Sequence, residues 1–235
     1  MMVQIGNFLF RYRNMLFPVL CLPHFYPAKW VIPQVAVAIA AGLMISTAGQ
    51  VIRILTIGLA YIIRGGRDHK VYAKDLVTEG VFSHCRNPLY VGNIMVITGL
   101  GLMSNSVYGI FVLPPLAVFA YQAIVRAEEA FLKGKFGDEY TAYTKRVNRW
   151  LPDLRGLGNT LVGMEFKWGR VLVKEYNSTY VWTTLAVLLI AEDLYVEGER
   201  TGFYPFQPLF MALLVVLFMG YSFARFLKKS GRVKG

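Results

Sequence analysis

Long apolar runs alternate with short polar segments along this chain. Residues 31–63 form the clearest early run, and four more runs cover residues 89–104, 107–127, 179–196 and 206–227. A membrane-spanning helix needs about 20 apolar residues to cross about 30 Å of hydrocarbon. The pattern therefore predicts an all-α polytopic membrane bundle with five or six spans and a central helical hairpin.

Two stretches do not fit a simple span. Residues 31–63 would reach about 50 Å as one helix, and Gln50 and Arg53 interrupt the run. We expect residues 50–63 to leave the lipid or to pack on protein, with Arg53 at the interface or paired with a hairpin residue. Residues 14–27 are short and contain three prolines, which predicts a thin span or a re-entrant segment.

The hairpin is the best-defined element. Residues 89–104 and 107–127 are separated by a turn that is too short for any other connection. Pro88 suits the first turn of the first helix, where its missing N–H is harmless, and amides at the helix start could face a carboxylate. Pro114 and Pro115 should kink the return helix.

Loop charges predict the orientation. Five Lys or Arg residues lie in 64–88, nine in 132–178 and five in the tail from 225, whereas 192–204 has four acidic residues and one Arg. Because loops rich in Lys and Arg stay in the cytosol, we predict that both termini and the three basic segments are cytosolic. Residues 192–204 should lie outside.

Composition agrees with a membrane protein. Of the 235 residues, 55% are hydrophobic and 17% are charged, and the mean hydropathy is +0.44. The net charge of +11 raises the question of nucleic acid, but the basic residues lie between apolar runs and form no continuous soluble face. Cys21 and Cys85 provide neither a disulfide framework nor a metal site. We expect no nucleic-acid partner and no metal, and the sequence leaves the oligomeric state open.

Two polar stretches carry the candidate chemistry: "LVTEGVFSHCRNPLYVG" (76–92) and "RAEEAFLKGKFGDEYTAYTKRVNRWLP" (126–152). Together they resemble the isoprenylcysteine carboxyl methyltransferase and phospholipid methyltransferase family of integral membrane enzymes, over about residues 40–152. The matching positions are Leu76, Val77, Thr78, Gly80, Arg86, Pro88, Tyr90, Glu128, Glu129, Leu132, Phe136, Gly137, Tyr140, Tyr143, Val147, Arg149 and Pro152.

The resemblance implies methyl transfer from S-adenosylmethionine to a lipid or lipid-attached acceptor. It implies catalytic roles for Glu129 and Arg149. The implied cofactor-binding residues are Val77, Thr78, Gly80, Asn87, Pro88, Tyr90, Glu128 and Glu129. Asn87 stands where family members have His, so a mechanism that uses this residue as a base is not expected. Phe82 likewise stands where they often have Tyr.

The resemblance also suggests a division of the chain. Residues 1–63 would be N-terminal membrane helices, and residues 64–152 would be a methyltransferase core of loop, hairpin and interfacial helix. Residues 153–235 would add a cytosolic segment and two further spans.

Physical chemistry supports such a site. S-adenosylmethionine has an ammonium, a carboxylate and a sulfonium, so its pocket needs donors and acceptors. Adjacent helical residues point about 100° apart, so Glu128 and Glu129 should do different jobs. Gln122, Arg126 and Glu129 share one face, and the other face comprises Tyr121, Val125, Glu128 and Leu132. Arg149 can hold a carboxylate or a phosphate by paired hydrogen bonds.

Several alternatives remain at this point. Glu128 and Glu129 could instead pair with Arg126 and Lys133 on a solvated helix end. The spacing of Tyr140, Tyr143, Val147 and Trp150 predicts an apolar stripe that holds an interfacial helix to the membrane. His84 and Cys85 are expected to be structural or solvent-facing. Two other functions compete with methyl transfer: a membrane reductase of related fold that uses NADPH, and a non-catalytic membrane scaffold. The acceptor stays open between a prenylated cysteine and a phospholipid head group.

Overall fold

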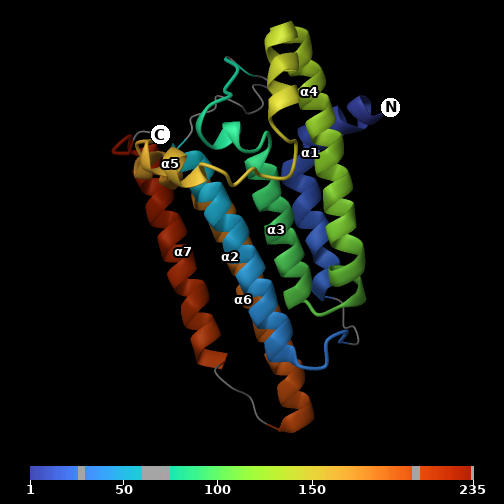
Figure 1. Ribbon diagram of the computed structural model, residues 1–235. Helices are drawn as coiled ribbons and strands as arrows, with labels where there is room; N and C mark the ends of the chain where they lie inside the picture. Colours follow the sequence, from blue (N-terminus) through green and yellow to red (C-terminus); the bar gives the residue numbers. More distant parts are fainter. Residues whose placement is uncertain (26–29, 60–72, 74, 203–206, 234–235) are drawn as a thin grey trace.

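Helices account for the regular structure of this protein. The computed structural model describes residues 1–25, 30–59, 73, 75–202 and 207–233, and these form no strand. Their α-helices are α1 (Met2–Cys21), α2 (Val35–Leu59), α3 (Pro88–Met103), α4 (Leu113–Arg146), α5 (Leu157–Val162), α6 (Trp168–Thr201) and α7 (Gln207–Lys229). Figure 1 shows the long helices side by side, with both chain termini at the end of the bundle where α5 lies. The predicted all-α helical bundle is confirmed.

Four helices in the described part of the chain are long and apolar enough to cross a membrane. They comprise Val35–Leu59, Tyr108–Arg146, Trp168–Thr201 and Pro208–Lys229, and the 16-residue α3 is a shorter apolar helix. These helices correspond to the runs that the sequence predicted as spans. The protein is therefore an integral membrane protein by the length and composition of its helices.

Glycines set the distance between α2 and α3. A Cβ atom at Gly99 would lie 2.2 Å from Ser46 Oγ and 2.4 Å from the Gly42 carbonyl oxygen. At Gly92 it would lie 2.7 Å from the Gly49 carbonyl oxygen. Small residues at such contacts allow two membrane helices to approach closely and to pack over a large area. This seam holds the start of α3 at a fixed height on α2.

The described part of residues 50–63 does not leave the bundle. α2 continues without a break to Leu59, and residues 60–63 lie outside the described part of the chain. Of the two alternatives expected for this part, packing on protein holds, because Arg53 finds partners inside the bundle, one of them on the hairpin. Glu175 of α6 accepts hydrogen bonds from its Nε at 2.9 Å and its Nη2 at 2.7 Å, and Asn93 of the hairpin accepts a third. Pairing of this kind lets charged side chains remain within a membrane bundle.

Residues 14–21 differ from the thin span or re-entrant segment that was expected over 14–27. Residues 14–21 belong to the continuous helix α1, and they form neither a separate thin span nor a re-entrant segment. α1 packs against α4, because Gly6 has no side chain to keep the two helices apart. A Cβ atom there would lie 2.0 Å from the Ala123 carbonyl oxygen and 2.9 Å from Ala127 Cβ. The apolar contact that stabilises this helix involves α4, more than a hundred positions away.

The predicted hairpin is confirmed by α3 and the helix that follows it. The irregularity expected at Pro114 and Pro115 is a π-helical turn over Tyr108–Val112, directly before the prolines. α4 extends beyond the predicted end of the hairpin and bends sharply at Gly137, which has φ 53° and ψ −119°. Figure 1 shows that the chain folds back here, at the same end of the bundle as the termini. Glycine suits this position because φ is positive.

The predicted membrane-binding stripe is wrong. Tyr140, Tyr143 and Val147 are buried and pack with Leu132 and Ala73 in one cluster. The fold at Gly137 explains the difference, because it lays the last turns of α4 back on the turns before it. The apolar stripe therefore fixes the returning chain to the protein.

Candidate functional site

The site is built where the turn before α3 meets the chain that leaves α4. The Arg86 amide donates to the Asn148 carbonyl at 3.0 Å, and the Asp153 amide donates to the His84 carbonyl at 3.0 Å. The Tyr143 hydroxyl donates to the Phe82 carbonyl at 2.7 Å. These contacts place the two motif-bearing stretches of the sequence against each other.

His84 and Cys85 hold this junction together. His84 Nδ1 lies 2.6 Å from the Asp153 carbonyl oxygen, and its Nε2 lies 2.9 Å from Thr160 Oγ1. Since a carbonyl only accepts, the proton belongs on Nδ1 and Thr160 donates to Nε2. The Cys85 thiol contacts the carbonyl oxygens of residues 149 and 150 at 3.7 Å and 3.5 Å. Burial raises the pKa of this thiol above its ordinary value. Their predicted structural role is confirmed.

Glu129 is the centre of the charged cluster. Arg149 donates to it from Nε at 2.9 Å and from Nη2 at 2.7 Å, and Arg86 Nη1 lies 3.3 Å away. Asn87 is buried, and its Nδ2 donates to the Arg149 carbonyl at 3.2 Å. Asn87 thus fixes the backbone of the residue that orients Glu129. The predicted catalytic residues, Glu129 and Arg149, lie in direct contact.

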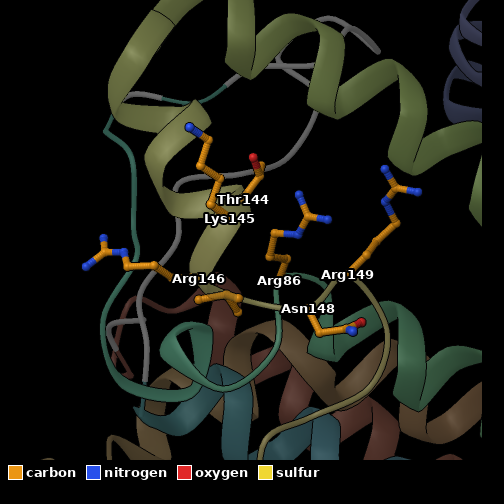
Figure 2. Close-up of a pocket in the computed structure, with 7 residues that line it drawn as sticks. Arg86, Thr144, Lys145, Arg146, Asn148 and Arg149 are labelled. Carbon is orange, nitrogen blue, oxygen red and sulfur yellow. The ribbon is translucent and has the colours of Figure 1, made fainter.

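Two adjoining pockets open at this cluster and share Arg86, Thr144 and Arg149. The first has a volume of about 460 Å³ and is lined by Arg86, Thr144, Lys145, Arg146, Val147, Asn148 and Arg149. Figure 2 shows the Arg86 and Arg149 side chains extending in the same direction beneath the end of α4, while Arg146 points away from them. The lining of this pocket is strongly basic.

The second pocket combines acid and base. Its volume is about 480 Å³, and it is lined by Val3, Arg86, Arg126, Glu129, Ala130, Lys133, Tyr140, Thr141, Thr144 and Arg149. Glu129 is the single carboxylate among these residues. Arg86 Nε is buried without a hydrogen-bond partner among the described residues. The pocket therefore offers both an acceptor for a cation and several donors for an anion.

Glu128 lies on the other side of the helix. It is buried, and the Tyr90 hydroxyl donates to its Oε1 at 2.6 Å. The Tyr90 ring lies against Tyr121, with 5.1 Å between centroids. The sequence correctly predicted that the two adjacent acids point apart. It also grouped Glu128 correctly with the buried face of the helix, at Tyr121, Val125 and Leu132.

The remaining predicted residues are dispersed around this junction. Val77 and Thr78 are half-buried and are not among the residues that line the two pockets. Gly80 has φ +62° and packs against Met164, which a Cβ atom would approach to 2.6 Å. Pro88 is buried at the first turn of α3. The structure thus brings Asn87, Glu129 and Arg149 together, and it places the half-buried Tyr90 against the buried Glu128 in a neighbouring pair.

One expectation about this helix start is wrong. The amides of Tyr90 and Val91 do not face a ligand, because both donate to the Asn87 carbonyl, at 3.0 Å and 3.1 Å. Trp150 also departs from the predicted stripe: its Nε1 donates to Gln122 Oε1 at 2.9 Å. Both groups complete hydrogen bonds within the protein.

Sequence reasoning missed several pocket-lining residues. Arg86 was visible as part of the Arg-Asn-Pro motif, but its contact with Glu129 was not. The sequence led to no prediction for Thr144 or Lys145, and Arg126 was considered only as a partner of the acids on a solvated helix end. No sequence signal points to Val3, because its place in the pocket depends on the packing of α1 against α4. In the described residues, no group of three or more His, Cys, Asp or Glu side chains could hold a metal ion.

Comparison with known proteins shows a similarity to methyltransferases over the central segment of the chain. Residues 35–139 match the family model described as phospholipid methyltransferase. This segment contains α2, α3 and most of α4, and therefore both Glu128 and Glu129. Arg149 lies beyond it.

Curated relatives fall into two named groups. The chain is 32% identical over 129 residues to the cobalt-zinc-cadmium resistance protein CzcN of Cupriavidus metallidurans, which covers 55% of this chain and 54% of that protein. It is 38% identical over 80 residues to the nickel-cobalt-cadmium resistance protein NccN of Alcaligenes xylosoxydans xylosoxydans, which covers 34% of this chain and 37% of that protein. It is 32% identical over 126 residues to the protein-S-isoprenylcysteine O-methyltransferase of Rattus norvegicus, over 50% of this chain and 42% of that protein.

The matches thus span between about a third and about half of these relatives' length. No solved structure matches the chain. The family match and the motif order both include the hairpin. Over this segment, the chain is similar to the isoprenylcysteine carboxyl methyltransferase and phospholipid methyltransferase family.

Proposed function

We propose that this protein transfers a methyl group from S-adenosylmethionine to a lipid or lipid-attached acceptor at the cytosolic membrane face. The observation that carries the proposal is the position of Glu129. Its carboxylate lies between Arg86 and Arg149 and lines a pocket at one end of a membrane bundle. Polar groups at the mouth of such a bundle are accessible to water-soluble and to lipid-soluble molecules.

The second pocket fits this cofactor. Its volume of about 480 Å³ falls within the range of about 300–1,000 Å³ for small-molecule sites. Glu129 would accept from the ammonium or the ribose hydroxyls, and Arg86 or Arg126 would donate to the carboxylate. When bound, S-adenosylmethionine supplies an activated methyl group on a sulfonium, which is a good leaving group.

The role of the protein in such a transfer is mainly to orient and to desolvate. Arg149 holds the Glu129 carboxylate in one plane by two parallel hydrogen bonds. Asn87 holds the Arg149 backbone, and the half-buried Tyr90 holds Glu128. A carboxylate acceptor needs no base at neutral pH. An amine acceptor must lose a proton, and Glu129 is then the base within reach of the pocket.

The arrangement suggests separate routes for the two substrates. We propose that the cofactor enters from the cytosol, where the basic pocket opens, and that the acceptor enters from the bilayer along the helices. Both chain termini lie at the same end of the bundle as the folded-back end of α4, and this end of α4 contributes residues 144–146 to the first pocket. The basic tail and loops support a cytosolic location for this end.

Transfer of radiolabel tests the proposal. The purified full-length protein would be incubated with S-adenosylmethionine labelled in the methyl group and with a total lipid extract in mixed micelles. We expect label in the organic phase, on lipids whose mass rises by one methylene. The Glu139→Gln variant, which changes an exposed carboxylate on α4, should transfer label at the wild-type rate. Absence of lipid label with folded protein would overturn the proposal, and bound NADPH fluorescence would favour a reductase instead.

A further inference from the structure

A series of contacts between buried and half-buried side chains connects α6 to the candidate site. The α6 end of this series has no role in the function proposed above. Glu175 of α6 is 3% exposed. It accepts two hydrogen bonds from Arg53 of α2 and one from Gln50 Nε2 at 3.2 Å. Gln50 Nε2 also donates to Thr179 at 3.1 Å. A buried charge pair in a membrane bundle costs free energy unless all its hydrogen-bonding groups have partners. The presence of the Arg53–Glu175 pair therefore needs a physical explanation.

The pair acts on the helix that begins at the site. Arg53 lies across α3 at Gly92, where a Cβ atom would come within 2.6 Å of its Cγ. Its Nη1 donates to Asn93 Oδ1. Gly92 and Asn93 belong to the second turn of α3, immediately after the turn that contains Tyr90. Glu175 therefore determines where Arg53 packs against α3 and where it donates a hydrogen bond. α3 is the helix that begins at the site.

From Asn93 the contacts continue to the acids. The Asn93 side chain lies next to the Tyr121 hydroxyl and interacts with it. The Tyr121 ring packs against Tyr90, and Tyr90 donates to Glu128 at 2.6 Å. Every link in this series is a direct contact between buried or half-buried side chains. Coupling of this kind requires such a physical connection.

We propose that Glu175 is a positioning residue for the Glu128 end of the site. It fixes Arg53, and through Asn93 and Tyr121 it sets the orientation of the Tyr90–Glu128 pair. α6 begins beyond residues 35–139, the segment that matches the family. In this protein, the site is therefore supported by a carboxylate from the C-terminal part of the sequence. The proposal rests on the proposed function only for its effect on the cofactor.

Fluorine NMR tests the coupling without reference to activity. The full-length protein would be labelled with 3-fluorotyrosine in detergent, and Tyr90→Phe and Tyr121→Phe would assign two signals. Glu175→Gln should shift both signals, whereas Glu199→Gln, at an exposed position near the far end of α6, should shift neither. Unchanged signals in folded Glu175→Gln protein would overturn the proposal.

Cofactor affinity gives the second readout. Glu175→Gln should raise the dissociation constant for S-adenosylmethionine by roughly threefold to thirtyfold, and Glu175→Asp, which keeps the charge, should recover part of the loss. An unchanged constant would overturn the proposal and leave the proposed function standing. If the wild type binds no S-adenosylmethionine, the proposed function fails and the fluorine signals decide the coupling alone.

A second variant covers the case in which Glu175→Gln does not fold. Asn93→Ala removes the link between Arg53 and Tyr121 and leaves the Arg53–Glu175 pair in place. It should shift the Tyr121 signal and weaken cofactor binding in the same way. If the folded Asn93→Ala protein shows neither a shifted Tyr121 signal nor weaker cofactor binding, the proposal is overturned.

Discussion

Arg149 donates two hydrogen bonds to Glu129, from Nε at 2.9 Å and from Nη2 at 2.7 Å. Twenty positions separate these residues, and the fold at Gly137 brings them together. The paired geometry fixes both the position and the plane of the carboxylate. Predictions about the site follow from this contact and from the groups that support it.

Arg149→Lys should weaken S-adenosylmethionine binding by about tenfold or more. Lysine keeps the positive charge, but a single ammonium cannot form the planar pair of hydrogen bonds. Isothermal titration of the purified protein would measure the change. An affinity within twofold of the wild type would show that charge alone is needed here.

Asn87→Leu should reduce cofactor affinity, because it leaves the Arg149 carbonyl without its donor at 3.2 Å. A lost hydrogen bond of a buried group costs about 1–3 kcal/mol. Asn87→His restores the residue of the family pattern and supplies a ring N–H, so its affinity should stay closer to the wild type. Equal affinities for Asn87→Leu and the wild type would contradict the supporting role of this amide.

Cys85 should resist alkylation in the folded protein. Burial raises the pKa of its thiol, with smaller opposing effects from the Asn87 amide and the Arg86 charge. The thiolate is the reactive form, so a raised pKa lowers the reactive fraction at pH 8. In a Cys21→Ser background, iodoacetamide should label the native protein at least about tenfold more slowly than the denatured protein. Equal labelling rates would place Cys85 in contact with solvent.

Gly99→Ala should destabilise the bundle by about 1–3 kcal/mol, a typical cost of added volume in a close-packed contact. The new Cβ atom would lie 2.2 Å from Ser46 Oγ and 2.4 Å from the Gly42 carbonyl oxygen. Unfolding in sodium dodecyl sulfate, followed by tryptophan fluorescence, would measure the loss. Gly134→Ala is the matched control: nothing lies within 4 Å of its Cβ position, and alanine favours a helix. Equal stabilities of the two variants would contradict close packing at this seam.

Local patterns in the sequence predicted the elements but not their partners. Apolar runs and turn length were enough to predict the hairpin, since both are local properties. The helical repeat correctly separated Glu128 from Glu129. By contrast, the pairing of Arg53 with Glu175 spans 122 positions, and a charge in an apolar run carries no mark of its partner. For this reason the sequence left open whether residues 50–63 leave the lipid or pack on protein.

The site shows the same limit. Motif order grouped Asn87, Glu129 and Arg149 through a family resemblance, and the structure places them in contact. The reversal at Gly137 turned Tyr140 and Tyr143 inward, where amphipathic spacing alone indicated a membrane contact. Spacing identifies an apolar face but not the surface that covers it.

The central claim is that the Glu129 pocket binds S-adenosylmethionine, and equilibrium binding to the detergent-purified full-length protein tests it most directly. We predict saturable binding by the wild type and by Glu139→Gln. Glu129→Gln should lose about tenfold or more in affinity, because hydrogen bonds to a charged group are worth about 1.5–3 kcal/mol. No saturable binding by the folded wild type, or equal binding by Glu129→Gln, would contradict the account.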